Sequence, residues 1–342
     1  MECSGLKDNE MSALCHKLYV ELTSSCNLNC SMCFHNNWFD EEFSVMGQET
    51  AENLKKLLTS RVADEVFFGG MGEPLLHSGI YEMVSLAKRN GMKTELITNA
   101  TLLDADVSEK LTESGIDTVW ISMDAFSKEK YEKVRRGSLF AKIISNIDGF
   151  NRIRKNTKLG IAFVMMKENL SELDKINEFA DRYNVDLINL SHVIPSEAMP
   201  ESESVYDLPY RVGKMRRFYK NGIHNKKYDC CPFIEDNACF IRHDGGVFSC
   251  MQLLHNSYMY LYTERRKSYA WSFGNINHND FREIYNSEGY TDFRKRVKAF
   301  EFPCCTICLG CEDRKENLKD CMYNEAPTCG ACLWAAGLIR CP

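Results

Sequence analysis

Three cysteines near the N-terminus have the spacing of ligands to a metal cluster. They stand in residues 23–34, TSSCNLNCSMCF, as Cys26, Cys30 and Cys33. Thiolates at intervals of four and three residues can converge on one face of an iron-sulfur cube, which leaves the fourth iron without a protein ligand. An open coordination position distinguishes catalytic from structural metal sites. The alternatives are three reduced thiols, or a zinc site completed by His35.

A second group of cysteines follows much later in the chain. Of the 17 cysteines, none lies between Cys33 and Cys230, and 12 lie from Cys230 to the C-terminus. Two fully ligated iron-sulfur cubes need about eight thiolates, so the supply is sufficient. Cys305-x2-Cys308 and Cys329-x2-Cys332 also fit the spacing of a zinc ribbon, which is the competing interpretation.

The elements that must position the first group alternate between strands and helices. Six short, mostly continuous apolar runs are typical of parallel strands covered on both faces. Amphipathic helical stretches separate them and provide the crossovers that parallel neighbours require. The pattern predicts an α/β fold, a partial parallel (β/α)6 barrel. The expected strands are residues 17–22, 64–69, 93–98, 117–122, 159–165 and 185–191.

The pattern changes in the second half of the chain and suggests a division into domains. Residues 1–16 form an N-terminal extension and residues 17–195 the barrel. Residues 196–228 begin with a Pro-, Ser- and Glu-rich stretch and are expected to form a linker. Residues 229–342 form a cysteine-rich domain, with a hairpin expected around Asp244-Gly245-Gly246.

Composition excludes several classes of function. The 342 residues carry 42 Lys and Arg against 48 Asp and Glu, a net charge of -6, which argues against a general binder of nucleic acid or anionic membranes. No apolar run approaches the roughly 20 residues that span a bilayer, and the first residues lack the apolar segment of a secretion signal. We therefore expect a cytoplasmic protein with no nucleic-acid or membrane partner.

The first cysteine motif carries a family resemblance. The segment CNLNCSMCF, C-x3-C-x2-C followed by an aromatic after a first strand, resembles the loop of radical S-adenosylmethionine (radical SAM) enzymes. The resemblance implies that Cys26, Cys30 and Cys33 bind a catalytic 4Fe-4S cluster whose open iron is chelated by S-adenosylmethionine. Reductive cleavage of that cofactor would then give a 5'-deoxyadenosyl radical that abstracts a substrate hydrogen.

The ends of the later strands supply the expected cofactor-binding residues, since chemistry collects at the C-terminal ends of strands in parallel barrels. The segment Gly69-Gly70-Met71-Gly72-Glu73-Pro74 resembles the family's Gly-Gly-Glu-Pro segment, interrupted here by Met71 and Gly72. In the family that segment holds the methionyl amino group. Arg135 or Arg136 would face the cofactor carboxylate, and Arg135 is the one assigned. The cofactor-binding residues implied are Phe34, Gly69, Gly70, Gly72, Glu73, Asn99, Ser122, Asp124 and Arg135.

The C-terminal region resembles the SPASM extension of radical SAM enzymes that modify peptides and proteins. Cys231, Gly245 and Cys250 fit the opening of its signature, whereas the later cysteine spacing departs from it. The resemblance implies two auxiliary 4Fe-4S clusters, with the assignment of ligands to each left open. The expected ligands are Cys231, Cys250, Cys305, Cys308, Cys311, Cys321, Cys329, Cys332 and Cys341.

The last sixteen residues, together with the segments CFHNNW and FFGGMGEPLLH, resemble the radical SAM maturases associated with tungsten-cofactor oxidoreductases, and this resemblance covers nearly the whole chain. The leading hypothesis is a maturase that oxidatively modifies a peptide or protein, in the maturation of a tungsten-containing aldehyde oxidoreductase. It would receive electrons from a ferredoxin or flavodoxin. The alternative is a maturase that forms thioether or carbon-carbon crosslinks in a small ribosomal precursor peptide. From another class, the chain could be a non-catalytic iron-sulfur electron carrier or a zinc-organised binding module.

Overall fold

The computed structural model describes residues 14–196, 231–261, 264–308 and 310–335. Most of the expected linker at 196–228, the expected ligand Cys341 and nearly all of the N-terminal extension lie outside these ranges. Among the described residues, no helix has the length and apolar character needed to span a bilayer.

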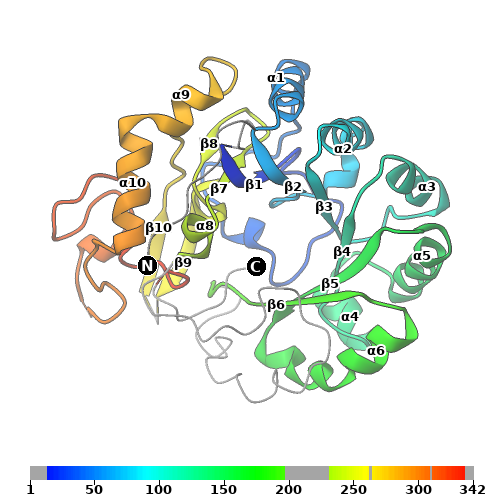
Figure 1. The fold of residues 1–342 in the computed structure, drawn as a ribbon. Helices are drawn as coiled ribbons and strands as arrows, with labels where there is room; N and C mark the ends of the chain where they lie inside the picture. Colours follow the sequence, from blue (N-terminus) through cyan, green and yellow to red (C-terminus); the bar gives the residue numbers. More distant parts are fainter. Residues whose placement is uncertain (1–13, 197–230, 262–263, 309, 336–342) are drawn as a thin grey trace, which may run out of the picture.

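A curved sheet with helices on its outer side forms the N-terminal part of the molecule (Figure 1). All six expected strands are present, in the spatial order β6-β5-β4-β3-β2-β1, and every neighbouring pair is parallel. The predicted partial barrel is therefore confirmed. Its strands are β1 (Cys15–Val20), β2 (Ala63–Phe68), β3 (Lys93–Thr98), β4 (Thr118–Ser122), β5 (Lys158–Met165) and β6 (Leu187–His192).

The connecting helices lie on the outer face of this sheet (Figure 1). In α2 the buried residues are Ile80, Met83, Val84 and Ala87, the i, i+3, i+4, i+7 spacing of a single helix face. The helices are α1 (Gln48–Thr59), α2 (Ile80–Arg89), α3 (Ala105–Glu113), α4 (Lys128–Val134), α5 (Phe140–Ile153) and α6 (Ile176–Arg182), with 3-10 turns η1 (Phe34–Asn37), η2 (Pro74–Leu76) and η3 (Lys167–Lys175).

The sheet continues into the cysteine-rich region. Strand β7 (Ala238–Ile241) pairs in parallel with β1, and β8 (Val247–Phe248) pairs antiparallel with β7, which confirms the expected hairpin. Gly245 has a φ of +87°, and a Cβ there would lie 2.7 Å from Asn275 Oδ1, so the turn requires glycine. The barrel and the cysteine-rich region are thus joined through one shared sheet.

Regular structure becomes sparse toward the C-terminus. Between residues 300 and 335, the described part of the chain contains one 3-10 turn and no strand. The remaining elements are α8 (Pro232–Glu235), η5 (Met251–Leu253), the hairpin of β9 (Ser257–Leu261) and β10 (Glu264–Ser268), α9 (Phe281–Asn286), α10 (Glu288–Ala299) and η6 (Asp313–Lys315).

Candidate active site and auxiliary cysteine sets

The loop that follows β1, residues 21–34, carries Cys26, Cys30 and Cys33 and is called the barrel loop below. Its backbone is attached to the C-terminal end of α4: Ser31 N donates to Val134 O at 2.8 Å and Asn29 N donates to Arg136 O at 3.1 Å. The loop also turns on itself, because Cys33 N donates to Cys30 O at 3.1 Å. The chain therefore holds this loop by its own hydrogen bonds.

The three thiols of the barrel loop lie close enough to affect one another. Cys30 is buried, and Cys26 and Cys33 are partly buried. Burial raises the pKa of all three thiols and raises that of Cys33 to about 12, where negative charge on Cys30 and Cys26 adds to the rise. Three thiolates gathered in a poorly hydrated loop need a compensating cation, which the iron of a cluster supplies. This donor set fits a three-cysteine iron-sulfur site.

Glycines at the end of β2 let the next loop pack directly on the barrel loop. A Cβ on Gly72 would lie 2.2 Å from Thr23 O, and one on Gly70 would lie 2.7 Å from the Glu21 side chain. A Cβ on Gly69 would lie 2.5 Å from Ile97 Cγ2. Neighbouring atoms of the chain therefore already require glycine at these positions. Their approach to a bound cofactor stays a prediction.

Glu73 lies in the same loop with its carboxylate buried. It accepts from Thr98 Oγ1 at 2.8 Å, from Asn99 N at 2.8 Å and from Leu75 N at 3.1 Å. Burial raises its pKa, and its negative charge in turn raises the pKa of Cys26. The structure therefore brings Glu73 beside the barrel loop, and its contact with an ammonium group stays a prediction.

Asn99, at the end of β3, links that strand to the barrel loop. Its Nδ2 donates to Asn27 Oδ1 at 2.9 Å and to Cys26 Sγ at 3.8 Å. Phe34 is buried at the start of η1, directly after Cys33. Ser122 is partly buried at the end of β4. These residues therefore share the C-terminal edge of the sheet with the cysteines.

A buried ion pair borders the three thiols. Arg135 Nη2 lies 2.6 Å from Asp124 Oδ2, and Asp124 Oδ1 accepts from Val164 N at 2.8 Å. Arg136 is exposed, so the structure brings only Arg135 into the site. Arg135 Nε is buried and has no hydrogen-bond partner among the described residues. The positive charge of Arg135 opposes the rise in the pKa of Cys30, and its free Nε–H is suited to a carboxylate.

A second buried charge network, which the sequence analysis missed, joins the barrel loop to the cysteine-rich region. The Glu21 carboxylate accepts from His255 Nε2 at 2.8 Å, from Met71 N at 2.9 Å and from His243 Nδ1 at 3.2 Å. Although burial opposes it, these bonds lower the pKa of Glu21 to about 2. His255 Nδ1 lies 2.9 Å from Glu41 Oε2. Since both ring nitrogens face carboxylates, His255 is held as an imidazolium.

Four of the later cysteines come together from three separate segments. Cys329 is partly buried; desolvation raises its pKa, and the charges of Cys332, Cys250 and Cys231 add to the rise. Burial and the charges of Cys231 and Cys332 likewise raise the pKa of Cys250. We call Cys231, Cys250, Cys329 and Cys332 the first auxiliary set. The spacing of these cysteines along the chain does not predict this grouping.

Another three cysteines form a second auxiliary set beside the first. Burial raises the pKa of Cys305 to about 11, and Cys321, Asp320 and Cys308 add to the rise. We call Cys305, Cys308 and Cys321 the second auxiliary set. Cys311, also an expected ligand, is partly buried.

Across the described ranges, no three His, Cys, Asp or Glu side chains converge as ligands of one metal ion would. The thiolates around an iron-sulfur cube each bind a different iron atom and therefore stand farther apart.

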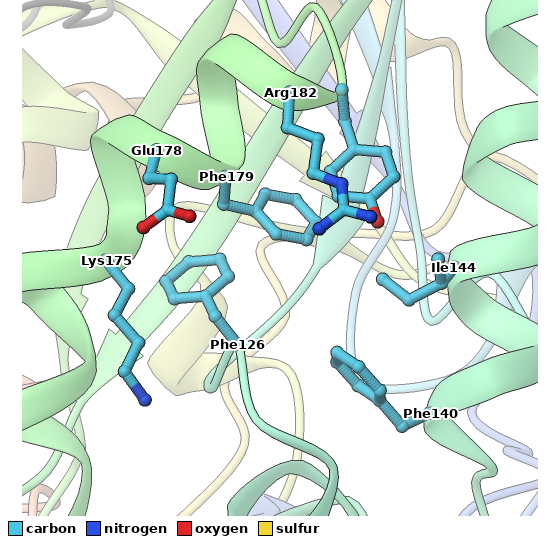
Figure 2. Close-up of a pocket in the computed structure, with 8 residues that line it drawn as sticks. Phe126, Phe140, Ile144, Lys175, Glu178, Phe179 and Arg182 are labelled. Atoms are coloured by element: carbon cyan, nitrogen blue, oxygen red, sulfur yellow. The ribbon is translucent and has the colours of Figure 1, made fainter.

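The structure also contains a cavity of about 160 Å³ between α5 and α6, with Phe126 and Phe179 at its centre (Figure 2). Their ring centroids are 4.7 Å apart, and Lys175 and Arg182 lie on either side of them. None of the residues that line this cavity is one of the expected site residues. It is separate from the cysteine sites.

Two family profiles match the chain. The Radical SAM superfamily profile matches residues 20–180, and the profile of SPASM, an iron-sulfur cluster-binding domain, matches residues 230–312. A relative from Pyrococcus furiosus, the tungsten-containing aldehyde ferredoxin oxidoreductase cofactor-modifying protein, is 30% identical over 95% of this chain and 96% of its own length.

Solved structures share the fold at lower identity. Streptococcus suis SuiB bound to its precursor peptide SuiA matches with a TM-score of 0.62 at 17% identity, over 82% of this chain and 67% of SuiB. The anSMEcpe protein with bound AdoMet and the Kp18Cys peptide matches with a TM-score of 0.61 at 18% identity, over 92% of this chain and 94% of that one.

Proposed function

Because the chain belongs to the radical SAM superfamily and carries a SPASM domain, we propose that it is a maturase that oxidatively modifies a peptide or protein. We propose further that it serves the maturation of a tungsten-containing aldehyde oxidoreductase, as the name of its Pyrococcus furiosus relative indicates. The observation that carries the proposal is the gathering of Cys26, Cys30 and Cys33 beside Arg135 at the C-terminal edge of the sheet.

In this proposal the residues at the C-terminal edge of the sheet have separate roles. Cys26, Cys30 and Cys33 would hold the 4Fe-4S cluster, Arg135 Nε would donate to the carboxylate of S-adenosylmethionine, and Glu73 would accept from its amino group. Together the cluster and S-adenosylmethionine supply one-electron chemistry that removes a hydrogen atom from the substrate. The buried Asp124–Arg135 pair keeps the guanidinium fixed, so that little reorganisation is needed when the cofactor binds.

The auxiliary sets would receive the electron that remains on the substrate after the hydrogen atom is removed. Loss of that electron together with a proton completes a two-electron oxidation of the substrate. Cys231, Cys250, Cys329 and Cys332 supply the four thiolates of one cube, and the second auxiliary set supplies three for another. A ferredoxin or flavodoxin as electron donor and a cytoplasmic location belong to the same proposal.

The chemistry is tested by anaerobic reconstitution with iron and sulfide, followed by reduction and incubation with S-adenosylmethionine. We expect 5'-deoxyadenosine to form, and its absence from a cluster-loaded sample would falsify the proposed function. The partner is tested by co-purification with a tungsten oxidoreductase. Capture of a short precursor peptide instead, with a new thioether or carbon-carbon crosslink in its mass spectrum, would support the ribosomal-peptide alternative.

A further inference from the structure

One buried arginine lies where the two auxiliary sets meet. Arg266, in the middle of β10, is 4% exposed. Its Nε donates to Arg314 O at 3.1 Å, and its Nη1 lies 3.8 Å from Met259 Sδ. The guanidinium therefore contacts a backbone carbonyl and a thioether, both of them uncharged.

Arg266 differs in this respect from the two other arginines buried in the described part of the chain. Arg135 pairs with Asp124, and Arg314 pairs with Glu264 through its Nε at 2.8 Å. Arg266 makes no ion pair with a carboxylate of any described residue. A buried cation without a counter-ion is strongly unfavourable, so another negative group is expected beside it.

Hydrogen bonds link Arg266 to the second auxiliary set, because Arg314, whose backbone O accepts from Arg266 Nε, donates from Nη1 to Cys305 O at 3.4 Å. Burial lowers the pKa of Arg266, and the charges of Cys332, Cys305 and Cys329 oppose that change. Cys329 and Cys332 belong to the first set and Cys305 to the second. The two sets are also close neighbours, because a Cβ on Gly330 would lie 3.0 Å from Cys305 Sγ.

We propose that Arg266 is a shared counter-cation of the two auxiliary clusters and that it raises the reduction potential of both. The inference rests on the proposed function, which assigns the two sets as cluster ligands. A cluster that accepts one electron gains one negative charge, and a fixed cation in a poorly hydrated site stabilises that reduced form. Arg266 itself gains or loses neither proton nor electron. It is a positioning charge that keeps both clusters able to accept electrons from the substrate.

Three variants of the full-length, reconstituted protein test this proposal. Arg266→Gln removes the charge, Arg266→Lys keeps it, and Arg265→Gln is the matched control, since Arg265 is exposed on the opposite face of the same strand. The reduction of each auxiliary cluster is followed by EPR during a potentiometric titration. In Arg266→Gln we expect the ratio of reduced to oxidised cluster at a fixed potential to fall about tenfold for both clusters, which equals a shift of about 59 mV for a one-electron couple. Arg266→Lys should move both ratios much less, and Arg265→Gln should match the wild type.

The iron content of the Arg266 variants distinguishes between the remaining outcomes. If Arg266→Gln loses auxiliary iron while Arg266→Lys retains it, the charge is needed and the proposal stands. If both variants lose iron, Arg266 acts by packing, and the proposal is overturned. If the reduction potential of only one cluster changes, or of neither, the charge is not shared, and the proposal is likewise overturned. Failure of the proposed function would appear elsewhere, in a wild-type protein that binds no auxiliary iron or forms no 5'-deoxyadenosine.

Discussion

In the barrel loop, hydrogen bonds from α4 and β3 hold three cysteines in place, whereas the auxiliary sets lie largely in a segment with little regular structure. The packing differs as well. Cys231, Cys250, Cys305, Cys329 and Cys332 contribute to or pack against the main hydrophobic core of the described residues, and the cysteines of the barrel loop lie outside it.

This difference indicates that the two regions depend on bound metal to different extents for their folding. The barrel loop is held in place by hydrogen bonds of the chain itself, so its shape is expected not to depend on the proposed cluster. The auxiliary sets join segments that have little regular secondary structure, so their metal is expected to contribute folding free energy, as structural metal sites do. Four predictions test this comparison.

The largest expected effect is on catalysis, from Cys30→Ala in the barrel loop. Production of 5'-deoxyadenosine should fall to background because one ligand of the catalytic cluster is lost, while auxiliary iron and thermal stability stay close to wild type. Product by liquid chromatography and iron content are the measurements. Cys15→Ala is the control, because the Cys15 thiol is buried on β1 and contacts Val62 O rather than the site. Residual product above background would show that the loop does not hold the catalytic cluster.

The next largest effect is on stability, from Cys332→Ala in the first auxiliary set. Loss of a metal ligand there should lower the free energy of unfolding by more than about 4 kcal/mol, in the range of a lost structural metal site. Thermal unfolding of the anaerobic protein and iron content are the measurements. The matched control is the exposed Cys304, as Cys304→Ala, which should change neither. The comparison fails if Cys332→Ala is no less stable than Cys30→Ala.

Asp124→Asn tests whether side chains rather than metal support the barrel site. It leaves Arg135 buried without its carboxylate, and breaking such a pair should cost about 3 kcal/mol. Urea unfolding of the metal-free protein measures it. The exposed Arg136, changed to Gln, is the control and should stay within about 0.5 kcal/mol of wild type. Equal stability of the two variants would mean that the pair does not support the metal-free fold.

The Glu21–His255 network joins the barrel loop to the cysteine-rich region, and its contribution to stability is predicted to depend on pH. Burial opposes the charged forms of Glu21 and His255, but their hydrogen bonds outweigh it. The pKa of Glu21 is therefore lowered to about 2, and that of His255 is raised. The Glu21 contribution to stability is present above pH 4.5 and is lost as the pH falls toward 2. The His255 contribution is present below pH 6.5 and is lost as the pH rises through the raised pKa. His255→Gln should therefore cost about 2 kcal/mol near pH 5.5, and less at higher pH.

Urea unfolding of wild type and His255→Gln across this pH range is the measurement. His278→Gln is the control, because His278 is exposed and has no part in the network. A difference between wild type and His255→Gln that stays constant from pH 5 to pH 9 would contradict the imidazolium assignment.

The local pattern of the chain was sufficient to predict the barrel and its cysteine loop. Continuous apolar runs alternating with amphipathic helices leave few topologies, and the six strands lie close to where they were expected. Arg135 and Arg136 show the limit of such reasoning. They are adjacent and chemically identical, and only the position of the C-terminal end of α4 decides that Arg135 is buried beside Asp124.

Contacts distant in sequence could not be predicted in this way. Glu21 and His255 are 234 residues apart, and neither belongs to a sequence motif that predicts contact with the other. The pairing of β7 with β1 brings them together. Likewise, the spacing of the cysteines along the chain does not predict that Cys231 and Cys250 influence the pKa of Cys329. The sequence by itself determined the catalytic motif, the strand pattern and the supply of thiols, because these depend on neighbouring residues. Only the tertiary structure decided which thiols share a site and which buried charges face them, because both depend on how distant segments pack.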